Sequence, residues 1–457
     1  MYDKFCVKKI IHGFGRGRIA FGTFLLIASV LLAGQAMAFQ LDLFGRPLSI
    51  KGYVNQSVQF VLAGDHYDTM QGFQQGLMQA LLELEYYQTD NLKYFVSGQL
   101  TKDWAYNIYD SDDDWNFRQF DKARDEMSLR DDYEDVLSEC HVTWTPGDFN
   151  LRVGKQIVTW GRMDGFRIMD QINPVDGRLG FSDVEFETNI IPIWLAKLEY
   201  FPPAVPDFLY MLAFEFTFNP NADFIPSKKP ATGNEVHGIW SASSASNMLR
   251  FMGLDENLEE PDRWDSDGYE YAFRIKGTFP DSTYFTVNFF DGVNNDAVKR
   301  SRFGEGDFGA GIDIDYTTQD DKNNFLTYPL MEGFYADQTF VGFTFAREFT
   351  EIVPKWAGGV SPLLRGEFIY EFDATFGQKN TVPPGGFSGL RDQFVEHDMI
   401  YWGLGVEWKI KVPWLNRRKN ISIMPQFGMK HIKDYPDYIS PMSGKRVVLT
   451  EGLSKVV

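Results

Sequence analysis

The chain has 457 residues, of which 44% are hydrophobic, 16% are aromatic and 23% are charged, and its formal net charge is −19 at pH 7. This acidic balance argues against a nucleic-acid partner, because the phosphate backbone is bound by basic surfaces. The two cysteines, Cys6 and Cys140, lack the Cys-x-x-Cys-His spacing of covalently attached haem and are too few for a disulfide scaffold.

The first 38 residues are typical of a cleaved secretory signal. Lysine and arginine residues precede an apolar run at 19–34, and Ala36-Met37-Ala38 forms an A-x-A cleavage site. The alternative is a membrane-anchoring helix, which needs about 20 apolar residues and so more than this run supplies. We expect residues 1–38 to be removed and residues 39–457 to form a single domain.

Segments of alternating hydrophobicity follow the signal, and the one at 400–410 is the clearest. Its even-numbered residues are apolar, whereas its odd-numbered residues are mostly glycine or charged. Because successive side chains of a strand point to opposite faces, this pattern predicts one apolar and one small or polar face. The pattern recurs at 196–200, 208–217, 269–277 and 364–372. An arginine or lysine facing lipid costs about 2–4 kcal/mol, so we expect the charged faces to line a wet interior.

About fourteen such segments are separated by connections that alternate between short and long. The turns at 89–91, 146–148 and 280–281 are short, whereas the connections at 162–191 and 220–266 are long. We therefore predict an all-β fold, an antiparallel up-and-down transmembrane β-barrel with short periplasmic turns and long external loops. The expected count is about 14 strands, with 16 as the alternative, and the last strand is expected at 446–457. An even count would put both termini on the short-turn side.

Basic and acidic side chains share the inner face of the predicted barrel. They are Arg152, Lys197, Arg274, Lys276, Arg365 and Lys409, beside Glu199, Glu270, Glu367, Glu371 and Glu407. A barrel of this size has a lumen wider than its own side chains can fill, whereas a barrel of about 8 strands does not. Because acids and bases are roughly matched, the wall predicts no strong preference for one sign of ion.

The connection at 161–191 differs from the other long connections, which are acidic. Its charged residues are Arg162, Asp164, Arg167, Asp170, Asp176 and Arg178, and they alternate with apolar residues such as Ile172. Buried charges need partners, so this mixture favours a loop folded into the barrel, where it would narrow the lumen and set its selectivity. The alternative is an external loop with internal salt bridges.

Three motifs surround the start of this connection: Arg152-Val-Gly-Lys-Gln156, Trp160-Gly161 and Ile172-Asn-Pro-Val-Asp176. Over residues 152–176 the chain resembles a family of Gram-negative outer-membrane proteins described mainly as a domain of unknown function. That family is related to porin and alginate-export-type barrels. The resemblance implies a barrel in the outer membrane, and it implies neither a substrate nor a catalytic residue.

No catalytic, cofactor or metal site is predicted. His397 and Asp398 are the nearest approach to a catalytic pair, but adjacent strand residues point to opposite faces, and the chain has no Gly-x-Ser-x-Gly motif. The acidic runs at 110–114 and 255–267 lack EF-hand spacing and are interpreted as solvated loop surface. We therefore expect a protein that is not an enzyme and that carries no cofactor.

The expected partners are those of an outer-membrane barrel, namely lipid, lipopolysaccharide and the barrel-assembly machinery. Tryptophans near strand ends are expected at the membrane interfaces; these are Trp104, Trp144, Trp160, Trp194 and Trp414. The sequence does not decide whether barrels associate as homo-oligomers.

The leading functional hypothesis is a porin-like channel for small solutes or ions. One alternative is export of an anionic polysaccharide. Another is a barrel that serves as a sleeve for a periplasmic or surface partner such as a multihaem cytochrome, whose haem would belong to the partner.

Overall fold

The computed structural model describes residues 37–61, 72–108, 128–163, 167–177, 189–228, 256–301, 331–353, 360–378, 393–412, 414, 420–434, 438–439 and 446–447. Residues 1–36 of the predicted signal at 1–38 and the acidic run at 110–114 lie outside these residues. Within the described residues no helix is long and apolar enough to cross a membrane.

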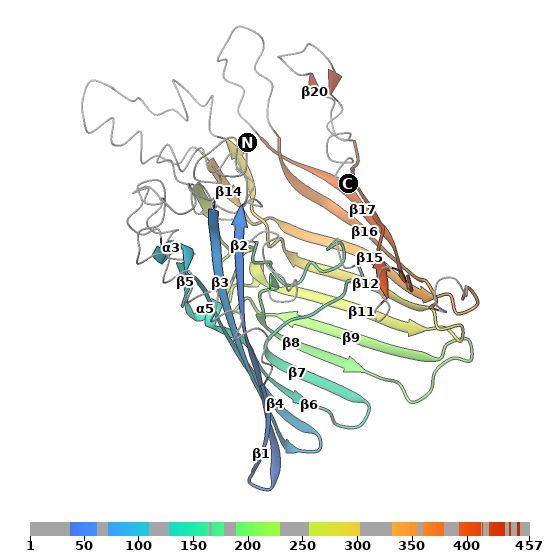
Figure 1. Ribbon diagram of the computed structural model, residues 1–457. Coiled ribbons are helices and arrows are strands. Elements are labelled where there is room, and N and C mark those ends of the chain that lie inside the picture. Colours follow the sequence, from blue (N-terminus) through green and yellow to red (C-terminus); the bar gives the residue numbers. More distant parts are fainter. Residues whose placement is uncertain are drawn as a thin grey trace.

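One antiparallel sheet dominates the chain (Figure 1). Its principal strands are β1 (Met37–Leu43), β2 (Arg46–Val61), β3 (Gly72–Thr89), β4 (Leu92–Asp103), β6 (Leu137–Trp144), β7 (Phe149–Gln156), β8 (Ile193–Tyr200), β9 (Met211–Asn219), β11 (Glu270–Thr278), β12 (Tyr284–Val293), β15 (Asp337–Glu348), β16 (Leu363–Gln378), β17 (Gln393–Ile410), β18 (Ile421–Ile423) and β19 (Gln426–Ile432). Each pairs with the next in chain order, and β18 and β19 both pair with β17. The all-β, up-and-down antiparallel prediction is confirmed for this sheet.

Shorter elements occupy the connections. They are β5 (Leu129–Arg130), which pairs with β4, the helices α3 (Ala105–Ile108) and α5 (Tyr133–Val136), the 3₁₀ turn η6 (Ser266–Gly268), a small sheet of β10 (Glu256–Glu259), β13 (Val298–Ser301) and β14 (Met331–Phe334), and the hairpin of β20 (Tyr438–Ile439) and β21 (Arg446–Val447). In Figure 1 the sheet curves strongly, with β2 and β3 on its left and β16 and β17 on its right.

The sheet differs from the prediction at both of its ends. An additional strand, β1, forms a hairpin with β2 through Phe44 and Gly45, whose positive φ angles of 56° and 75° suit a tight two-residue hairpin turn. β1 begins opposite Gly52, part-way along β2, so the first described strand does not start at the short-turn edge as expected. The predicted last strand at 446–457 is not found in the sheet: Arg446 and Val447 pair with β20, and the residues after them lie outside the described part.

The predicted alternation of faces is present. On β11, Tyr271 and Phe273 are 42% and 41% exposed, whereas Glu270 and Arg274 are 5% and 7% exposed. We call the face that carries the exposed apolar side chains the outward face and the opposite one the inward face. The sheet thus turns apolar side chains outward and shields polar ones, the reverse of a water-soluble sandwich.

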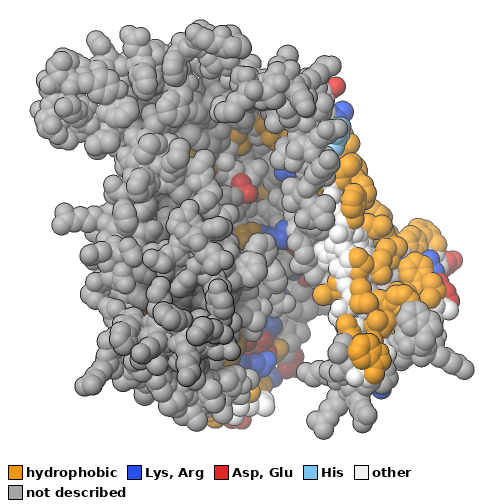
Figure 2. All heavy atoms as spheres, turned by 45° about the horizontal axis from the view of Figure 1, so that its top comes forward, with side chains coloured by type: hydrophobic (Ala, Val, Ile, Leu, Met, Phe, Trp, Pro, Cys, Tyr) orange, Lys and Arg blue, Asp and Glu red, His pale blue; other side chains and the backbone are white. Residues whose placement is uncertain are grey.

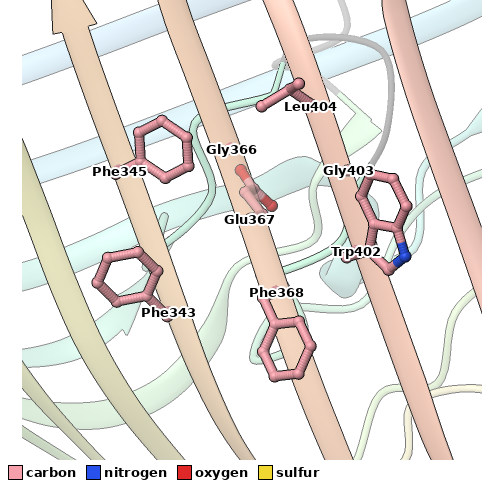
Figure 3. Close-up of a pocket in the computed structure, with 8 residues that line it drawn as sticks. All are labelled: Phe343, Phe345, Gly366, Glu367, Phe368, Trp402, Gly403 and Leu404. Atoms are coloured by element: carbon pink, nitrogen blue, oxygen red, sulfur yellow. The ribbon is translucent and has the colours of Figure 1, made fainter.

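The outward face is rich in aromatic side chains. Figure 2 shows hydrophobic side chains gathered on its right-hand side, over the last strands of the sheet. Figure 3 shows a shallow apolar groove there, where Gly366 of β16 lies among side chains of the neighbouring strands. The groove is lined by Phe343, Phe345, Phe368, Trp402 and Leu404. Phe345 covers the space that a side chain at Gly366 would need, so the aromatic ring protects the backbone of a glycine within the sheet.

Candidate functional site

The connection between β7 and β8 lies within the curve of the sheet (Figure 1), on the inward face. β7 ends at Gln156, earlier than the predicted strand, and the described residues 157–163 and 167–177 then run along the inward side. We call these residues the inner loop. Where the sequence predicted a loop over 161–191 inside a barrel, the structure places its described residues against the polar face of the sheet.

Two polar side chains give the inner loop its shape. Asn173 accepts a hydrogen bond from the amide of Val158 at 2.8 Å and donates to the carbonyl groups of Gln156 and Ile191 at 3.1 and 3.0 Å. It therefore ties the two ends of the connection together. Asp170 accepts the backbone amides of Trp160 and Gly161 through one carboxylate oxygen, at 2.6 and 2.7 Å.

Glu367 of β16 fixes the inner loop to the wall. Its carboxylate accepts the backbone amides of Arg162, of Met163 at 2.7 Å and of Met169 at 2.9 Å. The Glu367 side chain is almost fully buried, at 3% exposure. Burying a charge is costly unless it is well hydrogen-bonded, and charge-assisted bonds of this kind are the stronger class. Glu367 thus holds two stretches of the loop with a single side chain.

Inward-facing glycines make room for the apolar residues of the inner loop. A Cβ atom on Gly403 of β17 would lie 2.5 Å from the side chain of Ile168, and one on Gly342 of β15 would overlap Met169. Both Ile168 and Met169 are completely buried. The glycines of the inward face therefore form a recess in which these side chains sit.

Apolar contacts continue from this recess across the neighbouring strands. The buried cluster joins residues of the connection with wall residues of β8, β11, β12, β15 and β16; it consists of Val158, Trp160, Ile168, Met169, Ile172, Ile193, Leu195, Ala272, Phe290, Phe340 and Ile369, with Tyr401 of β17 packed against it. The inner loop thus covers a broad part of one side of the sheet rather than hanging free in its interior.

A charged network lies beside this cluster. Glu215 of β9 is fully buried and accepts the indole N–H of Trp160 at 2.8 Å and the guanidinium of Arg274 at 2.7 Å. Lys276 is 3.0 Å from Glu215 and also contacts Glu199. Arg274 donates a second bond to the carbonyl of Thr159 at 3.2 Å. The wall charges are therefore paired with one another, and the loop adds hydrogen bonds to Glu215 and Arg274.

Trp160 is a correction to the sequence analysis. It was expected at a membrane interface, but it is 1% exposed and its indole is bonded to Glu215 inside the sheet. By contrast, Trp144 and Trp414 are 50% and 84% exposed, as an interfacial role requires. Sequence position near a strand end does not distinguish these cases, because the chain turns inward after β7.

The charged residues predicted in the loop do not form one continuous row of ion pairs, and each has different partners. Arg162 stacks over the ring of Tyr284 at 4.2 Å and accepts a bond from Arg365 through its carbonyl. Arg167 donates to the carbonyl groups of Asp170 and Asn173 within the loop. The remaining residues are Asp176, which pairs with Arg130 at 2.8 Å, and Asp164 and Arg178, which lie outside the described residues.

The predicted wall residues all have register positions on the inward face. They are Arg152, Lys197, Glu199, Glu270, Arg274, Lys276, Arg365, Glu367, Glu371, Glu407 and Lys409. Several are paired: Lys197 with Glu199 at 3.5 Å, Arg365 with Glu407 at 2.5 Å, and Lys409 with Glu407 at 3.0 Å. Lys409 is 56% exposed at the short-turn end, whereas Glu371 is 4% exposed.

Some residues that organise the site were not predicted from the sequence. Glu215 lies on a correctly predicted polar face but was not singled out, and the structural role of Asn173 follows only from the path of the loop. Lys430 of β19 and Gln338 of β15 line the same interior. Within the described residues no three metal-ligating side chains come together, and the acidic run at 110–114 lies outside them.

Comparison with known proteins gives the family. A family model described as "Protein of unknown function (DUF1302)" matches residues 21–450. The chain belongs to this family. No curated protein matches this DUF1302 chain. Among solved structures it is similar to "Salmonella typhi OmpF complex with Daunomycin", with 12% identity and a TM-score of 0.28 over 85% of this chain and 92% of that one. Membership of DUF1302 assigns no activity, so the function is argued from the geometry of this chain.

Proposed function

We propose that this protein is an outer-membrane channel for small solutes or ions, in which the inner loop forms the constriction. The observation that carries the proposal is the combination of an apolar, exposed outward face with a polar inward face that holds a loop. Lipid on one side and water on the other is the environment in which this distribution is stable.

The height of the apolar band supports a membrane location. Along β17 the outward residues from Ile400 to Trp408 are all apolar, and Asp398 follows on the same face. There Asp398 accepts a hydrogen bond from Tyr370 and pairs with Lys433 at 3.0 Å. A membrane-spanning strand needs about 9–11 residues. The apolar stretch and its polar end match one bilayer crossing.

The directions of the edge strands support closure into a barrel. The sheet is fourteen positions wide from β1 to β18 and β19, and neighbouring strands are antiparallel throughout. The first and last strands of the sheet consequently run in opposite directions, so they can pair as antiparallel neighbours. Closure would remove the two free edges, which are otherwise exposed to unwanted pairing.

The pairing of the inward charges favours a general pore over export of an anionic polymer. Arg274, Lys276 and Arg365 each contact a glutamate of the wall. A track for a polyanion would need cations free to bind it. The inner loop also occupies interior space that a protein partner in a sleeve would require.

The proposed channel is tested by planar-bilayer recording of the refolded chain that begins at Phe39. We expect stepwise ion currents of uniform size. Protein that is folded, with β-rich circular dichroism, but that gives no current steps would contradict the channel.

Membrane insertion is tested separately by Phe273→Arg on the outward face. We expect a loss of about 2–4 kcal/mol in folding free energy in lipid vesicles, because the charge would face hydrocarbon. The matched control is Ile352→Arg, at an exposed position beyond the end of β15, for which about 0–1 kcal/mol is expected. Equal costs at the two positions would argue against a bilayer around β11.

A further inference from the structure

A cavity of 550 Å³ lies between the inner loop and the inward face of the last strands. Its size falls in the range of about 300–1,000 Å³ typical of small-molecule sites. The loop contributes Arg167, Asp170, Gln171 and Asn173, and the opposite wall contributes Gln338, Glu371, Tyr401 and Lys430 of β15, β16, β17 and β19. Residues 294–298 also line the cavity.

The loop side of the cavity is lined by the cation Arg167. Arg167 donates through Nη2 to the carbonyl groups of Asp170 and Asn173, at 3.0 and 3.1 Å. Its Nε atom is buried and has no hydrogen-bond partner among the described residues. A solute in the cavity would meet Arg167 through the part of its side chain that lines the cavity, and a guanidinium group can only donate hydrogen bonds.

The wall side of the cavity combines an aromatic ring with a second cation. Tyr401 and Lys430 are direct cross-strand partners, and the Lys430 ammonium lies 5.7 Å from the centre of the Tyr401 ring. The ring presents a flat apolar surface together with a polar hydroxyl. A cavity wall of this kind suits a solute that has both C–H and O–H groups.

The charges of the lining select against an ionic solute. Arg167 and Lys430 are opposed by Asp170, Glu371 and Asp296, so neither sign is in strong excess. Asp170 already accepts two backbone amides, and Glu371 is hydrogen-bonded by Gln338. The hydrogen-bonding groups that the lining offers to a solute are thus a mixture of donors and acceptors. Hydroxyl groups both donate and accept hydrogen bonds, and therefore match such a lining without adding charge.

We propose that this cavity binds a small neutral polyhydroxylated solute, a polyol or a monosaccharide, between Arg167 on the inner loop and Tyr401 on the wall. The inference rests on the proposed function in that the solute would reach the cavity along the pore. It also specifies the class of solute that binds transiently at the constriction.

The test is interruption of single-channel ion current by added solute. Glucose and sorbitol should produce concentration-dependent current blocks, and gluconate and glucosamine should produce weaker ones. Arg167→Lys and Tyr401→Leu should each weaken glucose blocking about tenfold, the cost of losing one hydrogen bond to a charged group or one contact of similar strength. The control is Ser422→Ala, which lies opposite Lys409 on the same face but at the short-turn end, and it should leave blocking unchanged.

The outcomes separate this inference from the proposed function. Normal ion currents without glucose blocking, or stronger blocking by gluconate or glucosamine, would overturn the inference and leave the channel in place. If the protein gives no current, the proposed function fails, and glucose binding is then measured by titration calorimetry in detergent. The absence of saturable heat in that experiment would overturn the inference as well.

Discussion

Two regions of the sheet, the strands covered by the inner loop and the strands β2, β3 and β4, show the same alternation of faces. Their inward charged side chains differ in exposure. On the side covered by the inner loop, Glu215 and Glu367 are 0% and 3% exposed. On the side formed by β2, β3 and β4, the paired side chains of Lys93 and Glu85 keep 26% and 25% exposure, and Lys51 is exposed. We call these the covered wall and the open wall.

The two walls differ in the surface that they present to the inner loop, and this indicates on which side of the loop the proposed pore would run. The covered wall presents glycines and apolar side chains such as Phe340 and Ile369, against which the loop packs. At comparable inward positions β2 presents Lys51, Tyr53 and Asn55, which offer no recess for apolar side chains. The loop therefore binds one wall, and solvent access is expected between the loop and the open wall.

Removing the loop should have the largest effect on this comparison. Deletion of residues 162–176 would expose the covered wall and widen the constriction. We expect a single-channel conductance roughly twofold higher or more, with altered ion selectivity. Planar-bilayer recording checks this, with circular dichroism to show that the sheet is retained. A folded deletion variant with unchanged conductance and selectivity would mean that the loop does not constrict the pore.

The second-largest effect is expected from reversing a charge on the open wall, which should change ion selectivity more than removing a charge on the covered wall. Lys51→Glu places a negative charge on the open wall and should shift the cation-to-anion permeability ratio about threefold towards cations. Lys276→Gln on the covered wall removes a charge that is already paired with Glu199 and Glu215, and should change the ratio less. Reversal potentials in a salt gradient measure both. A larger shift from Lys276→Gln would place the passage on the covered side.

Glu367→Gln tests the difference between the two walls by its effect on the free energy of unfolding. The amide has one acceptor oxygen where the carboxylate has two, and carries no charge, so the three loop amides lose bonding strength. We expect a loss of about 1–3 kcal/mol in unfolding free energy and faster proteolysis within the loop. The matched open-wall change is Glu85→Gln, for which about 0–1 kcal/mol is expected because its ion pair is partly exposed. Similar losses at both positions would contradict the anchoring role of Glu367.

The smallest effect is expected at a turn that lies outside both walls. The Asp281 carboxylate accepts a hydrogen bond from the backbone amide of Thr283 at 3.0 Å, which lowers the pKa of Asp281 below its usual value of 3.8. A lowered pKa stabilises the folded state above the unfolded pKa, and this stabilisation is lost as the pH falls through the folded value. Asp281→Ala should therefore be slightly less stable at pH 7, and the difference from the parent should shrink below about pH 4.

Urea unfolding in vesicles at several pH values checks this last expectation. A difference between Asp281→Ala and the parent that grows as the pH falls would contradict it. Because Asp281 also pairs with Arg347 at 3.2 Å, the turn serves as a reference for a local hydrogen bond together with a partly exposed ion pair.

The faces of the strands were predictable from the sequence. Alternation along 269–277 or 400–410 is a local property, since neighbouring side chains on a strand point to opposite sides. Proline has no backbone N–H to donate to a neighbouring strand, and the structure divides the last strand into β18 and β19 around Pro425. β1 was missed because its first residues coincide with the end of the predicted signal, which concealed the short alternation of Phe39 and Leu41.

Which side chains face outward and which face inward follows from the sequence alone, because it depends only on the two-residue period of a strand and on the polarity of each residue. The tertiary structure decided which wall the loop covers and which charges it buries. Glu367 meets the amide of Arg162 from 205 positions along the chain, and Gly403 accommodates Ile168 from a strand far from the loop in sequence. Contacts between such distant residues depend on how the whole sheet curves, which no local pattern specifies.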